Sequence, residues 1–202
     1  MATIQAEFPF MGVDFGSQEA GTTVAAWVDG GSLVVRQSAK GKSADRFLTD
    51  LIDELAPQTV YLDAPLSLPG VYRGLAGCDD WFYRECDRQT RAMSPMFLGG
   101  LTARAMRLAS SCADRTTFCE TYPKLIWQQI APDAAARKGR RPARPDAGQW
   151  AALAAFLPVP LAAAIPGHNH AFDAVLAWCG GWRHRQGCAV AYGDPREGII
   201  SV

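Results

Sequence analysis

Met11-Gly12-Val13-Asp14 is a short apolar run that ends in an acid, and the same pattern recurs at Val60-Tyr61-Leu62-Asp63 and Thr117-Phe118-Cys119-Glu120. Each run is rich in residues that favour β-structure and is followed closely by Gly or Pro, so each predicts a short buried strand. If the three strands are parallel neighbours, their carboxyl ends meet at one edge of the sheet, where open α/β sheets place their active sites. Carboxylates crowded at such an edge repel one another unless a divalent cation lies between them. The three acids that end these runs therefore predict a metal site.

A fourth acid, Asp173, lies in the first turns of a helix predicted over residues 169–184. That helix follows the break at Pro166-Gly167, and its apolar residues recur at the i, i+3, i+4, i+7 spacing of a face that packs on a sheet. Asp173 is next to this face, so it could join the other three acids. Each acid alone also has a structural interpretation, because Asp often begins a turn after a strand or stabilises the start of a helix.

The order of the predicted elements indicates an α/β fold with a mixed sheet. Asp29-Gly30-Gly31 is typical of a tight hairpin, so the strands on either side of it should be antiparallel neighbours. A helix, a strand, a helical insertion, another strand and further helices follow. The predicted strands span residues 9–17, 22–28, 32–37, 58–63 and 116–121, with short terminal strands at 189–192 and 199–200. The predicted helices span residues 44–55, 98–113, 124–131, 146–157 and 169–184.

Length and composition indicate one domain over residues 1–202. A chain of 202 residues with 49% hydrophobic and 20% charged residues is large enough to bury a substantial core. Its 20 basic and 20 acidic residues cancel, which counts against a polyanion partner but still permits a local basic surface. The only dense basic run, from Arg137 to Arg144, either follows a nucleic-acid backbone or keeps a loop soluble.

The six cysteines show no Cys-x-x-Cys pairing, which favours free thiols in a reducing compartment over a disulfide framework. Zinc bound by scattered Cys and His is an alternative. The amino terminus lacks the basic and apolar regions of a signal peptide, and the most apolar run, residues 151–165, is too short to cross a bilayer. We therefore expect a cytoplasmic protein without a membrane partner.

The segment over residues 64–100 is rich in Pro and Gly and is long for a loop, which suggests a flap over a functional site. Residues 80–91 could form a short helix within it, on which Arg84 and Arg88 lie one turn apart and could bind a phosphate. The alternative is a solvated helix face on which both arginines pair with acids of the same segment. Trp81-Phe82-Tyr83 offers stacking surfaces, although aromatic residues more often pack in a core.

Six motifs occur in order along the chain: Gly12 to Ser17, Leu62 to Pro69, Arg84 to Asp87, Cys119 to Pro123, Phe172 to Ala174, and the ending Tyr192 to Ile200. Together they resemble the "domain of unknown function 429" family, which is described as predicted nucleases with a ribonuclease H-like fold. The resemblance covers almost the whole chain. Its most specific parts are the Asp-Ala-Pro-Leu-Ser-Leu-Pro and Glu-Thr-Tyr-Pro segments.

The resemblance implies a sheet of three antiparallel strands extended by two parallel ones, flanked by helices. It also implies that Asp14 binds metal centrally, that Asp63 and Glu120 complete the set on the sheet, and that Asp173 adds an acid from the last helix. One position departs from the family pattern. His170 stands where a carboxylate is expected three residues before Asp173, and a His is a softer ligand than Mg²⁺ prefers.

A carboxylate cluster suits Mg²⁺ or Mn²⁺, which prefer oxygen ligands. Two such ions about 4 Å apart can activate a water and stabilise the leaving oxygen of a phosphodiester. On this hypothesis Asp14 bridges the ions, and the protein is a metal-dependent phosphodiester hydrolase that acts on nucleic acid. His168 or His170 could relay protons, although a His beside a helix start is more often a cap or a surface residue.

Two other functions stay open. Asp14-Phe15-Gly16-Ser17, followed by Gly21-Thr22-Thr23, also looks like the first phosphate loop of sugar kinases and actin-like ATPases. Those proteins hold ATP between two such domains, and the chain has no Walker-type or Rossmann glycine pattern. The other interpretation is a nucleic-acid-binding module without catalysis, which metal affinity would distinguish from an enzyme.

Overall fold

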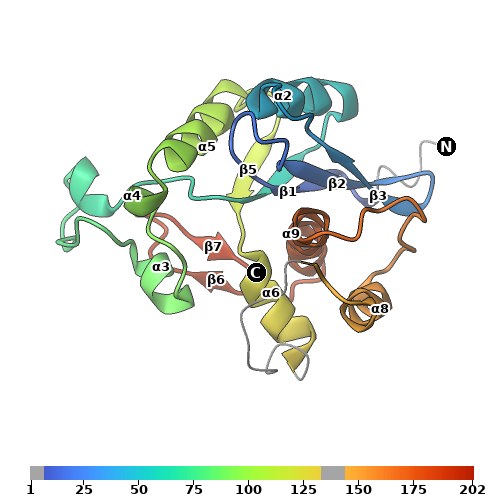
Figure 1. The fold of residues 1–202 in the computed structure, drawn as a ribbon. Helices are drawn as coiled ribbons and strands as arrows, with labels where there is room; N and C mark the ends of the chain where they lie inside the picture. The colour runs from blue at the N-terminus through green and yellow to red at the C-terminus, as the bar shows by residue number, and fades with distance from the viewer. Residues whose placement is uncertain (1–6, 133–143) are drawn as a thin grey trace.

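The computed structural model describes residues 7–132 and 144–202, and a five-stranded sheet lies at its centre (Figure 1). Its strands are β1 (Phe10–Asp14), β2 (Val24–Asp29), β3 (Ser32–Gln37), β4 (Thr59–Asp63) and β5 (Thr117–Glu120). They lie in the order β3-β2-β1-β4-β5, in which β1 pairs antiparallel with β2 and parallel with β4. β3 is antiparallel to β2, and β5 is parallel to β4. The α/β fold and the mixed sheet predicted from the sequence are therefore confirmed.

Helices cover both faces of the sheet (Figure 1). α2 (Ala44–Leu55) and α5 (Gly100–Ser111) share one apolar cluster with the first face, and α9 (Asn169–Arg185) packs on the second face with α6 (Pro123–Ile130) and α8 (Ala147–Phe156). β1 is buried from both sides, because alternate residues of the strand face the two clusters. No helix in residues 7–132 and 144–202 combines the length and the apolar character needed to cross a membrane.

α9 lies directly against β1. At Gly12 an added Cβ would stand 2.1 Å from the backbone nitrogen of Trp178, so only glycine allows the helix this close. Gly181 permits a similar approach, since an added Cβ there would stand 2.5 Å from the ring of Phe10. Phe10 precedes Gly12 in the strand whereas Gly181 follows Trp178 in the helix, so α9 runs antiparallel to β1. Its first turn therefore lies at the carboxyl end of β1, beside Asp14.

The segment between β4 and α5 contains three short helices, η1 (Gly70–Arg73), α3 (Glu85–Thr90) and α4 (Pro95–Leu98). It extends to one side of the sheet (left in Figure 1), where α3 contacts the small antiparallel sheet of β6 (Ala191–Tyr192) and β7 (Ile200–Ser201). The helix expected from residue 80 begins only at Glu85. The reason is that the Asp80 carboxylate accepts hydrogen bonds from the N–H groups of Phe82 and Tyr83 and holds a turn.

Candidate active site

Asp14 and Asp63 lie side by side at the carboxyl edge of the sheet. They are the last residues of β1 and β4, and the parallel pairing of these strands places them opposite each other. Side chains alternate along a strand, so Asp14 shares the face of Gly12 and Asp63 shares the face of Tyr61. Gly12 and Tyr61 both contact α9. The two carboxylates therefore lie on the side of the sheet where α9 begins.

α9 adds a histidine and a further acid to this pair. His170 Nδ1 lies 2.7 Å from Oδ2 of Asp14. This hydrogen bond raises the pKa of His170 above its ordinary value; partial burial opposes the rise, and the charges of Asp14 and Asp173 add to it. Asp173 lies one helical turn after His170. We refer to Asp14, Asp63, His170 and Asp173 as the acidic site.

His168 holds the start of α9. Its Nδ1 accepts a hydrogen bond from the N–H of Ala171 at 3.2 Å, and its Nε2 lies 3.0 Å from Oε1 of Gln37 on β3. Burial lowers the pKa of His168, and the charge of His170 lowers it further. A neutral His168 satisfies both contacts, so the cap interpretation fits this residue better than a proton relay.

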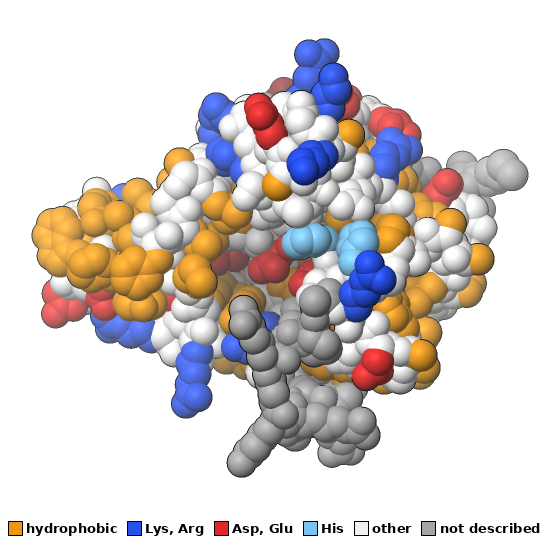
Figure 2. Space-filling model, in the orientation of Figure 1, with side chains coloured by type: hydrophobic (Ala, Val, Ile, Leu, Met, Phe, Trp, Pro, Cys, Tyr) orange, Lys and Arg blue, Asp and Glu red, His pale blue; other side chains and the backbone are white. Residues whose placement is uncertain are grey.

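A pocket of about 320 Å³ lies beside the acidic site, and Asp14, Asp63 and Glu120 line it. Much of the remaining wall is apolar and includes Ala92, Met93, Leu98 and Leu101. Figure 2 shows acidic side chains and histidines around a hollow in the middle of this face. The volume falls at the lower end of the roughly 300–1,000 Å³ that small-molecule sites occupy.

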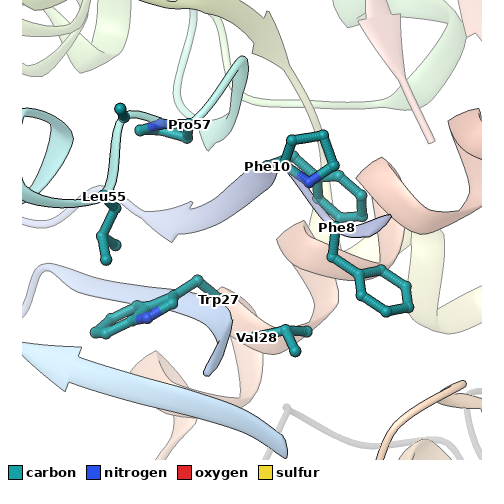
Figure 3. A pocket seen from close by; sticks show the side chains of 8 residues that line it. Phe8, Phe10, Trp27, Val28, Leu55 and Pro57 are labelled. Atoms are coloured by element: carbon teal, nitrogen blue, oxygen red, sulfur yellow. The ribbon is translucent and has the colours of Figure 1, made fainter. Parts of the chain in front are cut away.

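A second pocket lies at the opposite edge of the sheet (Figure 3). Phe8 and Phe10 line it from the beginning of β1, and Trp27 and Val28 line it from the end of β2. Its volume is about 50 Å³, and no titratable side chain lines it. A space that would hold one or two waters, without polar side chains, does not suit a substrate.

Glu120 lines the pocket of the acidic site but belongs to the other face of the sheet. β5 pairs with β4 so that Glu120 stands opposite Leu62, one position before Asp63. Because side chains alternate, this shift of one residue turns the Glu120 carboxylate away from the Asp63 side. The sequence predicts three equivalent acids, but the register separates Glu120 from the other two.

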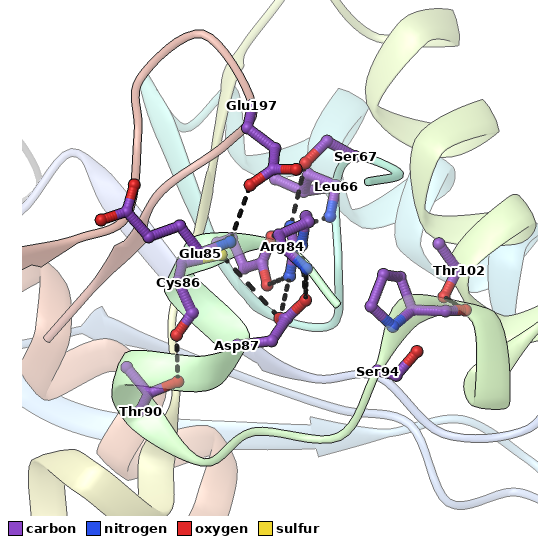
Figure 4. A network of polar contacts seen from close by, with 12 residues as sticks. Leu66, Ser67, Arg84, Glu85, Cys86, Asp87, Thr90, Ser94, Thr102 and Glu197 are labelled. Atoms are coloured by element: carbon purple, nitrogen blue, oxygen red, sulfur yellow. Dashed lines mark hydrogen bonds and ion pairs between the residues drawn. The ribbon is translucent and has the colours of Figure 1, made fainter. Parts of the chain in front are cut away.

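Arg84 binds Glu120 in a buried network, of which Figure 4 labels Arg84, Asp87 and Ser67. Its Nη1 and Nη2 donate to the two oxygens of Glu120 at 2.7 and 2.6 Å, and its Nη2 and Nε donate to Asp87 at 2.7 and 3.1 Å. Nη1 also donates to Oγ of Ser67 at 2.9 Å. All five N–H donors of the guanidinium are thus used, and the side chain is fully buried. The predicted phosphate contact does not fit Arg84, because no donor is left for it.

Burial and hydrogen bonding oppose each other in this network. Burial disfavours the charged form of Arg84 and lowers its pKa. The hydrogen bonds to Glu120 and Asp87 outweigh this effect, so the pKa of Arg84 lies above its ordinary value. Burial raises the pKa of Glu120, while Arg84 and the Leu66 N–H, which donates at 2.9 Å, oppose the rise. The three donors on its oxygens favour the charged form of the Glu120 carboxylate, and the cation that pairs with it, Arg84, is itself buried.

Glu197 ties the C-terminal loop to the same segment, although the sequence does not mark it as a site residue. Its Oε1 accepts a hydrogen bond from the N–H of Gly70 at 2.6 Å, and its Oε2 accepts one from the N–H of Glu85 at 2.7 Å. Ser67, Asp87 and Glu197 all lie in motifs of the family resemblance, which is the signal that could have found them. We refer to the set Ser67, Arg84, Asp87, Glu120 and Glu197 as the arginine network.

Arg88 lies on a solvated surface and pairs with an acid of its own segment, which is the alternative to a phosphate contact. It forms an ion pair with Asp80 on the surface, and 56% of its side chain is exposed. Residues 137–143 of the basic run lie outside the described residues, and its last member, Arg144, is exposed. Of the two arginines that the sequence emphasised, Arg84 therefore lies beside the pocket residue Glu120, whereas Arg88 lies on the surface.

Among residues 7–132 and 144–202, no group of three or more His, Cys, Asp or Glu is placed to hold a metal ion. Arg84 engages Glu120, and His170 engages Asp14. Mg²⁺, however, usually keeps several waters and binds through one or two carboxylates plus the phosphates of a substrate. Asp14 and Asp63 stand opposite each other at the ends of two paired strands, which fits this open mode of binding but does not form a closed cage.

Comparison of the chain with protein-family models, with curated proteins and with solved structures finds no match. The geometry of the acidic site and the motifs quoted above therefore carry the functional assignment.

Proposed function

We propose that this protein is a metal-dependent phosphodiester hydrolase that acts on nucleic acid, and that it belongs to the "domain of unknown function 429" family. The observation that carries the proposal is the pairing of Asp14 with Asp63 at the carboxyl edge of a mixed sheet, beside a pocket of about 320 Å³. Two neighbouring carboxylates repel each other, and a divalent cation removes that repulsion. The arrangement therefore favours cation binding at the position where α/β sheets place their chemistry.

Each member of the acidic site has a distinct role in this proposal. Asp14 and Asp63 would hold Mg²⁺ or Mn²⁺, which would supply a more acidic bound water and neutralise charge on the phosphodiester. His170, which is partly exposed and contacts Asp14, would accept a proton from a water bound beside Asp14. Asp173 supports the charged form of His170 once that proton is taken.

A nucleic-acid partner requires local positive charge, since the chain has no net charge. Lys40, Lys42 and Arg46 are exposed around the start of α2. Figure 2 shows Lys and Arg side chains gathered above the hollow, where α2 and α5 lie in Figure 1. Cations on that side of the hollow would favour contacts with phosphate groups.

The six cysteines are all free, which suits a reducing compartment. We place the protein in the cytoplasm on this basis.

The kinase-like alternative has less support in the loop after β1. The N–H of Gly16 donates to Oγ1 of Thr23 at 3.0 Å, and the Gly16 carbonyl accepts a hydrogen bond from Arg104 at 3.0 Å. A loop that holds phosphate needs backbone N–H groups that point at the ligand. The internal contacts of Gly16 leave that residue unsuited to the task.

Hydrolysis assays with Mg²⁺ or Mn²⁺ on labelled single-stranded, duplex, hybrid and branched substrates test the proposal. Asp14→Asn and Asp63→Asn should each lower the rate at least about a hundredfold, because each removes charge that holds the cation. Asp53→Asn is the matched control, since it makes the same change at an exposed acid of α2 and should leave the rate unchanged.

Two outcomes would overturn the hydrolase proposal. One is cleavage that persists in Asp14→Asn. The other is a wild-type protein that shows neither metal-dependent cleavage nor a rise in Tm when the metal is added. A metal-induced rise in Tm without cleavage of any substrate would favour the non-catalytic module instead.

A further inference from the structure

Exposed hydrophobic side chains gather on the segment between β4 and α5. Of the seven large hydrophobic residues that the described part of the chain exposes, five lie there: Tyr72, Trp81, Phe82, Met93 and Phe97. Figure 2 shows an extended hydrophobic patch over this segment, to the left of the hollow. We refer to these five residues as the aromatic platform. Exposed hydrophobic residues normally occur singly, so a continuous patch marks an interaction site.

The rings of the platform hold one another in place. Tyr72 and Trp81 meet edge to face with ring centroids 5.4 Å apart, and Phe82 lies 5.8 Å from Phe97. The backbone beneath Phe82 is fixed, because its N–H donates to Asp80 and its carbonyl accepts from Oγ of Ser94. Rings that are already ordered lose little conformational entropy when a ligand stacks on them.

The platform continues into the pocket of the acidic site. Met93 belongs to the platform and also lines the pocket. Leu98, which is not part of the platform but directly follows Phe97, lines the pocket too. The pocket, at about 320 Å³, has room for one nucleoside beside Asp14 and Asp63 but not for a duplex. The exposed side chains of the platform therefore adjoin the pocket that Asp14 and Asp63 line.

The charge of the segment favours stacking over a dense set of phosphate contacts. Residues 70–98 carry four arginines and four acids, whereas binding of a duplex relies on many cations along its backbone. Arg91 is exposed directly before Ala92 and Met93 at the pocket, and no described residue forms an ion pair with it. Surfaces that bind single strands combine aromatic rings, on which bases stack, with cations along the path of the backbone, and Arg91 is such a cation beside these rings.

We propose that the aromatic platform and the adjoining pocket bind single-stranded nucleic acid, with one nucleoside in the pocket and the neighbouring bases stacked on Phe97, Phe82 and Trp81. This inference rests on the proposed function, because it names the substrate class of the same site. Arg91 would contact a phosphate at the mouth of the pocket.

Fluorescence anisotropy in EDTA tests the inference without hydrolysis, with labelled oligo(dT), oligo(U) and a mixed-sequence duplex as probes. The wild type should bind at least one of the two single strands about tenfold more tightly than the duplex, and Phe97→Ala and Trp81→Ala should each weaken that binding roughly tenfold. Val190→Ala, which truncates an exposed hydrophobic residue outside the segment, should change nothing. Arg91→Ala should weaken binding less and reduce its dependence on salt.

Equal affinity for single strands and duplex, or unchanged binding by both aromatic variants, would overturn the inference even if metal-dependent cleavage persists. A wild-type dimer that Phe97→Ala converts to a monomer, measured by light scattering, would identify the platform as a protein interface and also overturn it. Single-strand binding that depends on Phe97 and Trp81, without any metal-dependent cleavage, would remove the hydrolase proposal while supporting the platform.

Discussion

Glu120 of the arginine network lines the same pocket as Asp14 and Asp63 of the acidic site, yet the two groups of residues neutralise their carboxylates differently. In the arginine network the cation is permanent and buried, and Arg84 donates all five of its N–H groups to Ser67, Asp87 and Glu120. In the acidic site the partner of Asp14 is His170, whose charge depends on pH and whose side chain is 43% exposed. A carboxylate with a permanent internal cation supports the fold. One with a titratable, accessible partner can exchange that partner for a ligand.

Of the variants considered, removal of Arg84 should lower the free energy of unfolding most. A small loss would contradict the structural role of the arginine network. Arg84→Met leaves Glu120 and Asp87 buried without their cation, and loss of one partner from a buried ion pair costs about 3–5 kcal/mol. Urea denaturation measures this free energy of unfolding. The variant Arg84→Met/Glu120→Leu is the control, since removal of a buried charge should recover part of the loss. A loss below about 1 kcal/mol for Arg84→Met would show that solvent reaches these acids.

Glu120→Gln separates a structural acid from a metal ligand. The amide keeps the shape of the side chain but weakens two charge-assisted hydrogen bonds, so stability should fall by about 1.5–3 kcal/mol. At a temperature where the variant is folded, its metal-dependent rate should match that of the wild type. A loss of rate as large as that expected for Asp14→Asn would return Glu120 to the metal site.

Most of the fold follows from local patterns in the sequence. The apolar runs that end in Asp14 and Asp63 predict β1 and β4, and Gly30-Gly31 predicts the turn between β2 and β3. The observed bounds of α2 and α9 lie within one residue of the predicted ones. β1 is shorter than expected and ends at Asp14, because Gly16 bonds to the side chain of Thr23 instead of continuing the ladder. Periodicity and turn chemistry are properties of neighbouring residues, which is why they can be read from one sequence.

The separation of the acids into the arginine network and the acidic site could not be predicted from such local patterns. A shift of one residue between β4 and β5 decides which face carries Glu120, and neither strand's own pattern contains that information. Arg84 meets Glu120 across 36 positions, and His170 meets Asp14 across 156. Such contacts depend on how distant elements pack. The close approach of α9 to Gly12, for example, places His170 at Asp14.

The contact between His170 and Asp14 should contribute less to stability than the arginine network, and the pKa of His170 tests this contact in the acidic site. Its pKa should lie above about 6.5 in the metal-free protein and should fall in Asp14→Asn, as NMR of the imidazole would show. Because the pKa of His170 is raised in the folded protein, the His170–Asp14 pair stabilises the fold fully at pH values below the pKa of His in the unfolded chain. That contribution is lost as pH rises through the folded pKa. Partial exposure limits it to below about 1 kcal/mol, and His170→Gln should abolish it. A pKa at or below 6.5 would mean that Asp14 does not hold the charged form.

Arg88→Ala should have the smallest effect, and it is the matched partner of the Arg84 variant. Both arginines lie in the same segment one turn apart, and each contacts a carboxylate, but Arg88 is 56% exposed. Water and salt screen an exposed pair, so its loss should change the free energy of unfolding by about 0–0.5 kcal/mol, and by less at high salt. The substitution leaves Asp80 free to keep its bonds to the N–H groups of Phe82 and Tyr83, so the turn beneath the aromatic platform should persist.

Urea denaturation at low and high salt, run on Arg88→Ala and Arg84→Met side by side, measures the difference in stability between the two variants. A loss of several kcal/mol would show that burial does not separate the two arginines. An unchanged stability with weaker substrate binding would instead assign to Arg88 the phosphate contact that Arg84 cannot make.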